Sequence, residues 1–312
     1  MCITKCGMFS IHQMLMSNEV RFPLDHNSVV AITGASSGIG AALVLELAQR
    51  GVCLALCARR ADRLAEVAQH ARARGARVFE LQADVSDETQ AVAFIERTLE
   101  TFGGRLDVLV HNAGRGHCAA VEDTPTKQLH SMFAVNVFPL WYLVRPVLPV
   151  MKSQRRGHIV AISSIVGKIA YPYNAAYVAA KHAVVGFIAA LRTELVETGV
   201  EATVVCPSGV ETEWASATEG SSIGELFAEG IARSRTIASE RGIPRAPLQR
   251  MKSAEDVARH IVGVIEAPPG HDVYTHEGSE ELVALAIKSR RDYERAMLPL
   301  LLGMRQAYEA RR

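Results

Sequence analysis

Three side chains in the middle of the chain have the types and spacing for acid–base chemistry on an oxygen atom. Tyr177 and Lys181 are four residues apart, so on a helix they share one face at about 6 Å between Cβ atoms. A lysine ammonium beside a phenol favours the phenolate and lowers the phenol pKa from about 10. We therefore predict that Tyr177 exchanges a proton near neutral pH. The alternative is a chance tyrosine–lysine pair on a helix.

Ser164 is the third side chain of this set. It follows the apolar run Ile159-Val160-Ala161-Ile162, which predicts a buried strand. Its hydroxyl should therefore emerge at the carboxyl end of a strand, where ligands bind in open α/β sheets.

The composition narrows the classes of partner. The 312 residues carry 34 basic and 33 acidic side chains, a net charge of +1, so no general attraction to nucleic acid or to an anionic membrane is expected. The six cysteines show neither a disulfide framework nor metal-ligand spacing, which indicates free thiols, a reducing cytoplasm and no metal site. No run of 18 apolar residues predicts a membrane span.

Short apolar runs alternate with helical patterns from residue 28 onward. Connections of helical length between strands produce parallel pairing, with helices on both faces. We therefore predict an α/β doubly wound parallel sheet of about seven strands. The expected strands are Ser28–Thr33, Val52–Cys57, Ala76–Gln82, Leu106–Val110, Gly157–Ile162, Glu201–Val205 and Asp272–Thr275.

No repeat or flexible linker divides the chain into two catalytic units. Residues 1–27 lack a cleavable signal pattern and are expected to form a flexible extension. Residues 28–275 are expected to form one catalytic domain, and its irregular, Gly- and Ser-rich part at 212–247 is interpreted as a substrate lid. Residues 276–312 show the apolar spacing of a helical extension that packs against the core or another subunit.

A glycine-rich turn joins the first predicted strand to the first helix. Glycines permit a tight turn and a close backbone approach, and the helix N-terminus offers free N–H groups to a pyrophosphate. A turn without a ligand is the alternative. The predicted cofactor residues in this loop are Gly34, Ser36, Ser37, Gly38, Ile39 and Gly40.

Arg59 and Arg60 stand after the second strand, where an acidic residue would bind the ribose hydroxyls of NAD. A guanidinium binds a 2′-phosphate through paired, charge-assisted hydrogen bonds. The sequence therefore predicts that NADP(H) is preferred over NAD(H). The alternative is that both arginines only begin a solvated helix face.

Taken together, these motifs resemble the short-chain dehydrogenase/reductase family in its compact single-domain form. The match covers roughly residues 29–275 and rests on TGASSGIG, Asp84-Val85, HNAG, Asn136, Ser164, Tyr177-x-x-x-Lys181 and PSGVET in the family's order. The resemblance implies a Rossmann fold and NAD(P)-dependent interconversion of an alcohol and a carbonyl.

The resemblance also implies a role for each matching residue. Tyr177 would be the general acid/base, Lys181 would lower its pKa and bind the nicotinamide ribose, Ser164 would orient the substrate oxygen, and Asn136 would anchor a water that relays protons. The adenosine and nicotinamide would meet a further set: Asp84, Val85, Asn112, Ala113, Gly114, Pro207 and Thr212.

Two residues depart from the family pattern. His111 replaces an asparagine, and its expected role is packing. Ser208 replaces a glycine, so a side chain must fit beside the nicotinamide.

The expected activity is therefore NADP(H)-dependent oxidoreduction of a small, hydrophobic alcohol or carbonyl substrate by a homodimer or homotetramer. Apolar surface around the expected site comes from Ile169, Tyr171, Tyr173 and Trp214. A 3-ketoacyl-thioester reductase is the alternative among enzymes. An NADP(H)-binding sensor or scaffold without turnover is the alternative from another class.

Overall fold

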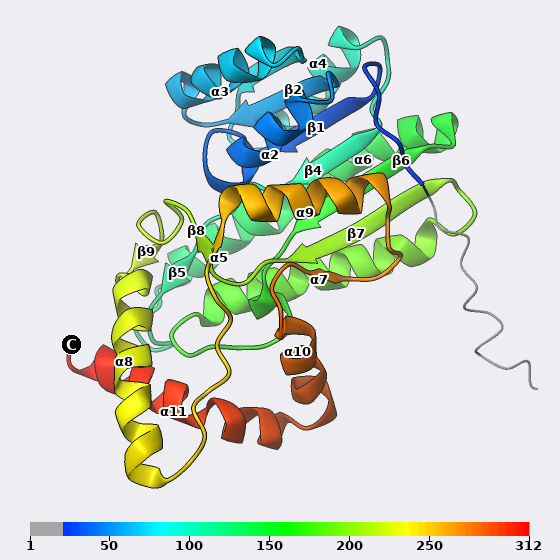
Figure 1. Ribbon diagram of the computed structural model, residues 1–312. Helices are drawn as coiled ribbons and strands as arrows, with labels where there is room; N and C mark the ends of the chain where they lie inside the picture. Colours follow the sequence, from blue (N-terminus) through cyan, green and yellow to red (C-terminus); the bar gives the residue numbers. More distant parts are fainter. Residues whose placement is uncertain (1–20, 312) are drawn as a thin grey trace, which may run out of the picture.

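A seven-stranded parallel sheet with helices on both faces forms the centre of the molecule (Figure 1). The computed structural model describes residues 21–311. The strand order is β11-β7-β6-β4-β1-β2-β3, so the predicted doubly wound architecture and strand number are confirmed. The strands are β1 (Val29–Thr33), β2 (Cys53–Ala58), β3 (Arg77–Gln82), β4 (Val108–His111), β6 (Gly157–Ile162), β7 (Val200–Cys206) and β11 (Val273–Tyr274).

Two apolar clusters, one on each face, explain why the central strands are apolar throughout. Side chains of a strand point alternately to opposite faces, so Val30 and Ile32 join one cluster while Val29 and Ala31 join the other. The first face is covered by α2 (Gly38–Ala48), α3 (Ala61–Ala73) and α9 (Ala254–Glu266). The second is covered by α4 (Glu88–Thr101), α6 (Phe138–Gln154) and α7 (Ala175–Glu194).

The winding of the sheet reverses beside β1. From β1 the chain proceeds through β2 to β3 at one edge and then crosses back to β4 on the other side of β1. In open α/β sheets the crevice at such a reversal, outside the carboxyl ends of the strands, is where ligands bind. The loops after β1 and β4 border this crevice.

The segment before β1 is held against the domain, in contrast to the flexible extension predicted there. Phe22 is buried, its backbone N–H donates to the Glu266 carbonyl at 2.7 Å, and the Arg156 guanidinium lies 3.9 Å from its ring centroid. The prediction is therefore wrong for residues 21–27, where one aromatic side chain and a cation–π contact supply the attachment. Residues 1–20 lie outside the described part of the chain.

Residues 126–154 form two helices in succession, α5 (Thr126–Asn136) and α6. The break at Val137 comes just before Pro139, which has no N–H to continue the helix. Pro146 and Pro149 lie inside α6 without ending it. The chain thus breaks just before the first of the three prolines and stays helical through the other two.

A well-formed helix, α8 (Ile223–Arg241), occupies much of the segment predicted to be irregular at 212–247. It packs against α11 (Arg290–Glu309), which follows α10 (Ser279–Lys288). A Cβ added to Gly303 would lie 2.3 Å from the Gly230 carbonyl oxygen, so the two helix backbones approach closely through these glycines. The prediction of an irregular segment is wrong at 223–241, where Gly230 lowers helix propensity but serves the packing of α8 against α11.

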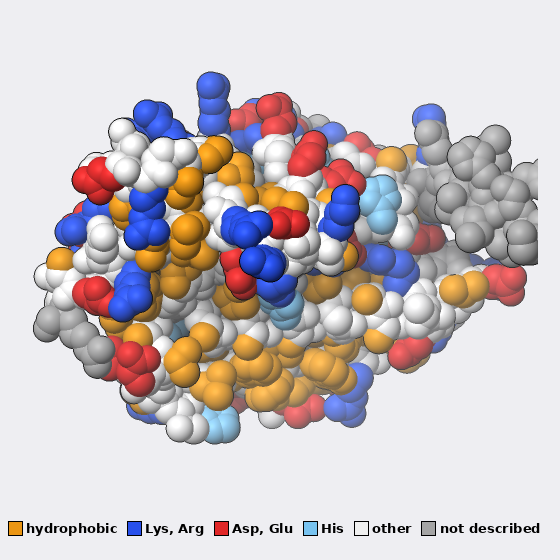
Figure 2. Space-filling model, turned by 90° about the horizontal axis from the view of Figure 1, so that it is seen from below, with side chains coloured by type: hydrophobic (Ala, Val, Ile, Leu, Met, Phe, Trp, Pro, Cys, Tyr) orange, Lys and Arg blue, Asp and Glu red, His pale blue; other side chains and the backbone are white. Residues whose placement is uncertain are grey.

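Figure 2 shows the molecule from below, the side on which α8, α10 and α11 lie in Figure 1. Hydrophobic side chains on this face are interspersed with both acidic and basic ones. The C-terminal helices therefore present no face of a single charge sign to solvent here.

Within residues 21–311, two helical stretches are long and apolar enough to cross a membrane, judged by length and composition alone: Thr126–Gln154 and Ala175–Glu194. Core helices of globular domains meet the same criteria, and here both stretches are partly buried, with α6 and α7 against the sheet. The four described cysteines are free and buried: Cys53, Cys57, Cys118 and Cys206.

The lowered pKa values of two buried histidines allow a prediction of how the free energy of unfolding depends on pH. Burial lowers the pKa of His111 and of His158 to about 4, so they stay neutral in the folded chain while unfolded histidines protonate near 6.5. The unfolded state binds more protons below pH 6.5, so the free energy of unfolding should fall between pH 6.5 and 4, by up to about 1.4 kcal/mol per pH unit for each histidine.

Urea unfolding at pH 7 and pH 5 checks this expectation. His158→Asn should reduce the difference in the free energy of unfolding between the two pH values, whereas His130→Asn, at an exposed histidine, should leave this difference unaltered. An equal pH dependence in wild type and His158→Asn would contradict the assignment.

Candidate active site

Ser164, Tyr177 and Lys181 come together at the carboxyl end of β6. Ser164 follows this strand and caps a short 3-10 helix, η1 (Ile165–Gly167), by accepting a hydrogen bond from Val166 N–H at 3.3 Å. Tyr177 and Lys181 lie on the first turns of α7, both buried, with Lys181 Nζ 5.7 Å from the Tyr177 ring centroid. Lys181 Nζ also donates to the Ile162 carbonyl at 3.0 Å. The strand end and the helix face therefore position the three side chains as predicted from their spacing.

The electrostatics of this cluster differ from the sequence-based expectation. Burial raises the pKa of the Tyr177 phenol, and a hydrogen bond with Ser164 opposes this shift only in part. Burial also lowers the pKa of Lys181 to about 8. The predicted depression of the Tyr177 pKa is therefore wrong for the protein alone, because burial is the largest cause of the shift and raises the pKa.

Asn136 lies beside Lys181 at the end of α5. Its side-chain amide donates to the Met132 carbonyl at 2.9 Å and to the Arg115 carbonyl at 3.1 Å. Its buried Oδ1 has no hydrogen-bond partner among the described residues. A Cβ added to Gly114 would lie 2.7 Å from this oxygen and 3.4 Å from Lys181 Nζ. The glycine thus leaves room next to an unsatisfied acceptor, which suits a bound water or ligand hydroxyl.

His111 supports Asn136 from the end of β4. Its Nε2 lies 3.1 Å from the Asn136 carbonyl oxygen, at the break between α5 and α6. The ring is fully buried and, as given above, neutral at physiological pH. These contacts favour the packing role expected for this departure from the family pattern.

The glycine loop after β1 has the backbone geometry of a phosphate cradle. Gly34 and Gly38 have φ of +66° and +54°, a region that favours glycine, and a Cβ on Gly40 would lie 2.4 Å from the Gly34 carbonyl oxygen. Ser37 caps α2 without a side-chain capping hydrogen bond. The loop thus presents a close backbone and a helix N-terminus to the crevice.

Asn112 holds this loop in place. Its side-chain amide donates to the carbonyls of Thr33 at 2.9 Å and Gly34 at 3.2 Å. Thr33 Oγ1 in turn accepts from the backbone N–H groups of Asn112 and Ala113, each at 3.0 Å. The residues after β4 therefore lie against the glycine loop, and the Asn112 side chain holds the loop backbone.

Three arginines gather at the start of α3, one more than sequence reasoning singled out. Arg59 lies 3.9 Å from the Asp84 carboxylate and is 60% exposed. Arg60 donates to Ser37 Oγ at 2.5 Å, and Arg63 donates to both carboxylate oxygens of Glu213 at 2.6 Å. Arg59 and Arg60 precede the first residue of α3, and Arg63 lies in its first turn.

Pro207 and Thr212, two further predicted cofactor residues, contact parts of the candidate site. The Pro207 carbonyl accepts hydrogen bonds from Ile165 N–H at 2.7 Å and from Ser164 Oγ at 3.3 Å. Ser208 Oγ contacts Gln249 at 3.2 Å, which accommodates the side chain where the family commonly has glycine. Thr212 Cγ2 lies 3.2 Å from the position of a Cβ on Gly38, so this segment packs on the glycine loop.

Two small sheets attach the segment after β7 to the rest of the chain. In one, β8 (Val210–Glu211) pairs with β10 (Lys252–Ser253); in the other, β9 (Glu219–Gly220) pairs with β5 (His117–Cys118). The Arg115–Glu219 ion pair, at 2.5 Å, reinforces the second. The segment is therefore docked over the site in this structure.

Apolar and aromatic side chains form the wall next to Tyr177. Its ring lies 5.1 Å from that of Trp214, and Tyr171 packs edge-on against Phe227 of α8 at 5.5 Å. Tyr177 belongs to the same apolar cluster as the C-terminal helices. Sequence reasoning did not connect those helices with the site.

Tyr308 of α11 is the clearest of these missed contacts. It stacks on Tyr173 with ring centroids 4.1 Å apart, and its hydroxyl accepts from Ala120 N–H at 3.0 Å. Tyr173 has φ of +63°, which is uncommon outside glycine. The C-terminal helix thus braces the loop that leads into Tyr177.

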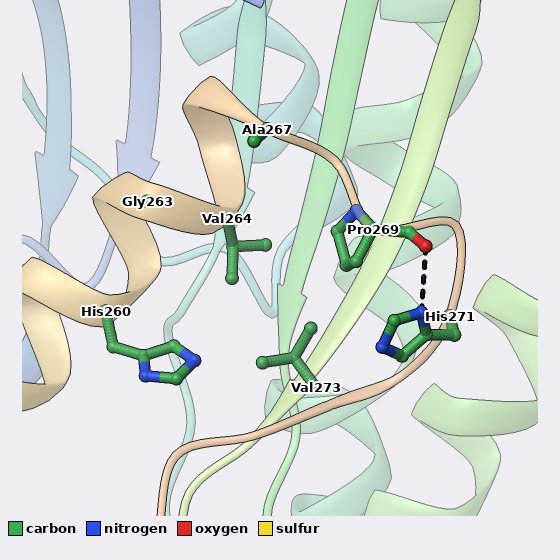
Figure 3. A pocket seen from close by; sticks show the side chains of 7 residues that line it. All are labelled: His260, Gly263, Val264, Ala267, Pro269, His271 and Val273. Carbon is green, nitrogen blue, oxygen red and sulfur yellow. Dashed lines mark hydrogen bonds between the residues drawn. The ribbon is translucent and has the colours of Figure 1, made fainter. Parts of the chain in front are cut away.

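A separate groove lies at the edge of the sheet, between α9 and the loop before β11 (Figure 3). His271 Nδ1 lies 2.8 Å from the Pro269 carbonyl oxygen there. The lining is His260, Gly263, Val264, Ala267, Pro269, His271 and Val273, so none of the predicted site residues takes part.

The crevice fits a dinucleotide by three independent features. First, the close approach of the glycine-loop backbone leaves no room for a Cβ at Gly40. Second, the buried Asn136 Oδ1, next to Lys181, has no hydrogen-bond partner among the described residues. Third, arginine side chains follow β2. A nicotinamide dinucleotide would meet the glycine loop with its pyrophosphate and the region of Asn136 and Lys181 with its nicotinamide end.

Comparison with known proteins agrees with this geometry. The family model described as short chain dehydrogenase matches residues 28–221. The chain is 35% identical over 212 residues to dehydrogenase/reductase SDR family member 7B of Bos taurus, covering 66% of this chain and 65% of that relative's length. It is 33% identical over 235 residues to a Streptomyces violaceoruber protein named as a ketoacyl reductase of granaticin polyketide synthase, covering 75% and 84%.

A solved structure shares the fold across most of the chain. It is a short chain dehydrogenase/reductase from Burkholderia phymatum in complex with NAD, with a TM-score of 0.72 and 29% identity, covering 86% of this chain and 96% of that one. The match of sequence, fold and crevice shows that the chain belongs to the short-chain dehydrogenase/reductase family.

Proposed function

We propose that the protein is an NADP(H)-dependent oxidoreductase that interconverts a hydrophobic alcohol with its ketone or aldehyde. The observation that carries the proposal is the cluster of the half-buried Ser164 with the buried Tyr177 and Lys181 beside the glycine loop. A nucleotide-binding module has no need of a buried phenol and ammonium placed at the nicotinamide end of its crevice.

When bound, NADPH would be the source of the hydride that a carbonyl carbon needs in the reductive direction. Ser164 donates a hydrogen bond to the carbonyl oxygen and orients it. Tyr177 transfers its phenolic proton to that oxygen, and the Lys181 ammonium stabilises the phenolate left behind. A water at Asn136 Oδ1, next to Lys181, suits the return of the proton from solvent.

The raised pKa of Tyr177 is consistent with this direction. A phenol that stays protonated at neutral pH is a proton donor, while Lys181, with its pKa at about 8, remains largely protonated there. Positive charge on Lys181 is then available when the phenolate forms.

A hydrophobic substrate is favoured by the surroundings of Tyr177. Trp214 lies next to it, and the apolar cluster to which Tyr177 belongs continues through Tyr171, α8 and α11. Few polar groups in this wall would compensate the desolvation of a charged substrate.

Preference for NADPH is supported by the arginines after β2. Arg59→Ala should raise KM for NADPH about 10- to 100-fold and change KM for NADH far less, because a charge-assisted hydrogen bond to a phosphate is worth about 1.5–3 kcal/mol. Initial rates with both cofactors measure this. Arg74→Ala, an exposed change at the other end of α3, is the control, and equal effects of Arg59→Ala on both cofactors would overturn the preference.

Two alternatives remain to be separated by experiment. A 3-ketoacyl-thioester reductase is favoured by the similarity to the Streptomyces protein. A sensor or scaffold would bind NADP(H) without turnover.

The test is a panel of aliphatic and cyclic ketones, aldehydes and β-ketoacyl thioesters, followed through loss of NADPH absorbance. Turnover of the hydrophobic ketones or aldehydes supports the proposal. Turnover of thioesters alone favours the ketoacyl reductase, and NADPH binding without any turnover favours the sensor.

We further propose a cytoplasmic homodimer or homotetramer. Leu129, Phe138 and Trp141 on α5 and α6 are between 41% and 46% exposed, and burying such side chains favours association.

A further inference from the structure

Glu213 connects the segment over the active site with the arginines at the start of α3. Its carboxylate lies 2.6 Å from Arg63 and 3.3 Å from Arg60, and Arg60 also donates to Ser37 Oγ in the glycine loop. Both arginines lower the pKa of Glu213, so the carboxylate is ionised at neutral pH. The Glu213 carboxylate thus forms ion pairs with two guanidinium groups next to the predicted position of a 2′-phosphate.

The neighbours of Glu213 on either side reach the two ends of the cofactor crevice. Thr212 packs on Gly38 of the glycine loop, and the Trp214 ring lies 5.1 Å from that of Tyr177. Trp214 N–H also donates to Thr212 Oγ1 at 3.2 Å, which makes the three residues one compact turn. Displacement of Glu213 is therefore expected to shift the position of Trp214.

We propose that Glu213 is a specificity-determining residue that competes with the cofactor 2′-phosphate for Arg60 and Arg63, and that its displacement couples NADP(H) recognition to the Trp214 segment. The inference rests on the proposed NADP(H) preference. The carboxylate and the phosphate are both anions that accept from guanidinium N–H groups, so they exclude one another at the same donors. NAD(H) has no 2′-phosphate and would leave the Glu213 ion pairs intact.

The size of the effect follows from the exposure of these groups. The side chains of Arg60, Arg63 and Glu213 are 48%, 47% and 53% exposed, so water and salt screen their pairing. Removal of the Glu213 charge should therefore tighten binding of a 2′-phosphate by about three- to tenfold, and less at high salt.

Adenosine 2′,5′-bisphosphate and AMP are the probes, because they differ only by the 2′-phosphate. Calorimetric Kd values should show Glu213→Gln binding the bisphosphate about three- to tenfold more tightly than wild type, with AMP unchanged. Glu211→Gln removes the same charge two residues away and should change neither Kd. Unchanged or weaker bisphosphate binding in Glu213→Gln would overturn the inference.

The same titrations separate this inference from the cofactor preference. If wild type binds the bisphosphate more tightly than AMP and Glu213→Gln has no effect, the role of Glu213 is refuted and the NADP(H) preference stands. If neither wild type nor Glu213→Gln distinguishes the two probes, the role of Glu213 and the NADP(H) preference are both refuted.

Trp214 reports the coupling, because the chain has only two tryptophans and Trp141 is 46% exposed on α6. In a Trp141→Phe background the bisphosphate, but not AMP, should shift Trp214 emission, and Glu213→Gln should abolish that shift. Emission that does not respond to the bisphosphate would contradict the coupling.

Discussion

Tyr177→Phe is expected to lower kcat for carbonyl reduction by about 10²- to 10⁴-fold, the usual contribution of a positioned general acid. The substitution removes one hydroxyl from a ring that is buried against Trp214, so packing is retained. The Kd for NADPH should stay within about twofold of wild type, since no other donor of the cofactor crevice is altered.

Tyr142→Phe is the matched control, because it removes the same atom from a half-buried tyrosine of α6. Its kcat should equal that of wild type. Undiminished kcat in Tyr177→Phe would show that the proton comes from another group.

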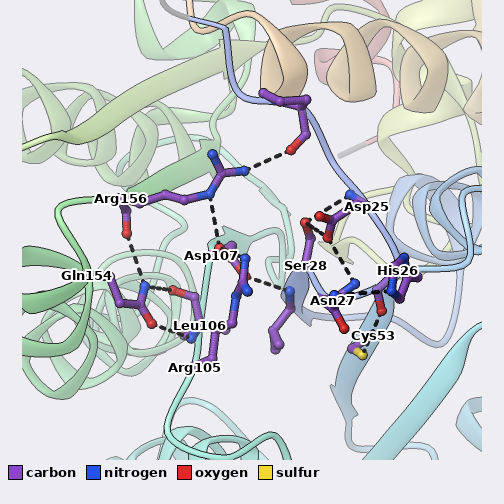
Figure 4. A network of polar contacts seen from close by, with 12 residues as sticks. Asp25, His26, Asn27, Ser28, Cys53, Arg105, Leu106, Asp107, Gln154 and Arg156 are labelled. Atoms are coloured by element: carbon purple, nitrogen blue, oxygen red, sulfur yellow. Dashed lines mark hydrogen bonds and ion pairs between the residues drawn. The ribbon is translucent and has the colours of Figure 1, made fainter.

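Asp107→Ala is expected to cause the largest loss of stability. The carboxylate is fully buried and accepts from Val29 N–H at 2.8 Å, from Arg105 at 2.7 Å and from Arg156 at 3.2 Å (Figure 4). Truncation leaves a buried N–H and two guanidinium groups without their acceptor. Removing one partner of a buried ion pair costs about 3–5 kcal/mol, out of a total stability of about 5–15 kcal/mol.

The lower end of that range is expected, because Arg105 and Arg156 are 40% and 33% exposed and can be rehydrated. Urea unfolding measures the effect. Asp107→Asn should lie between wild type and Asp107→Ala, since it keeps one acceptor oxygen. Asp62→Ala on the exposed face of α3 should stay within about 0.5 kcal/mol of wild type. A cost below about 1 kcal/mol for Asp107→Ala would refute this role.

Local patterns explain which parts of the fold were predictable. Apolar runs such as Ile159–Ile162 define buried strands by themselves, and the spacing of Tyr177 and Lys181 fixes them on one helix face. The position of Ser164 follows because a parallel sheet brings strand ends to one edge. These features depend on neighbours within about twenty residues.

The features that escaped prediction depend on distant contacts. Glu213 meets Arg63 across 150 residues of sequence, and Tyr308 reaches Ala120 across 188. Helix α8 was not predicted because Gly230 lowers the helix propensity of its sequence. The reason for a glycine at this position is the close approach of α11, which the sequence does not reveal. The upward shift of the Tyr177 pKa could not be predicted because it is caused by burial of the ring, which depends on the tertiary structure.

Transfer of deuterium tests the central claim most directly. NADPH deuterated at C4 of the nicotinamide would be incubated with the protein and the panel of hydrophobic ketones and aldehydes, and the products examined by mass spectrometry. The account predicts an alcohol with one deuterium on the former carbonyl carbon, formed by wild type and, to a far smaller extent, by Tyr177→Phe. Tight NADPH binding with no deuterium in any product would contradict it.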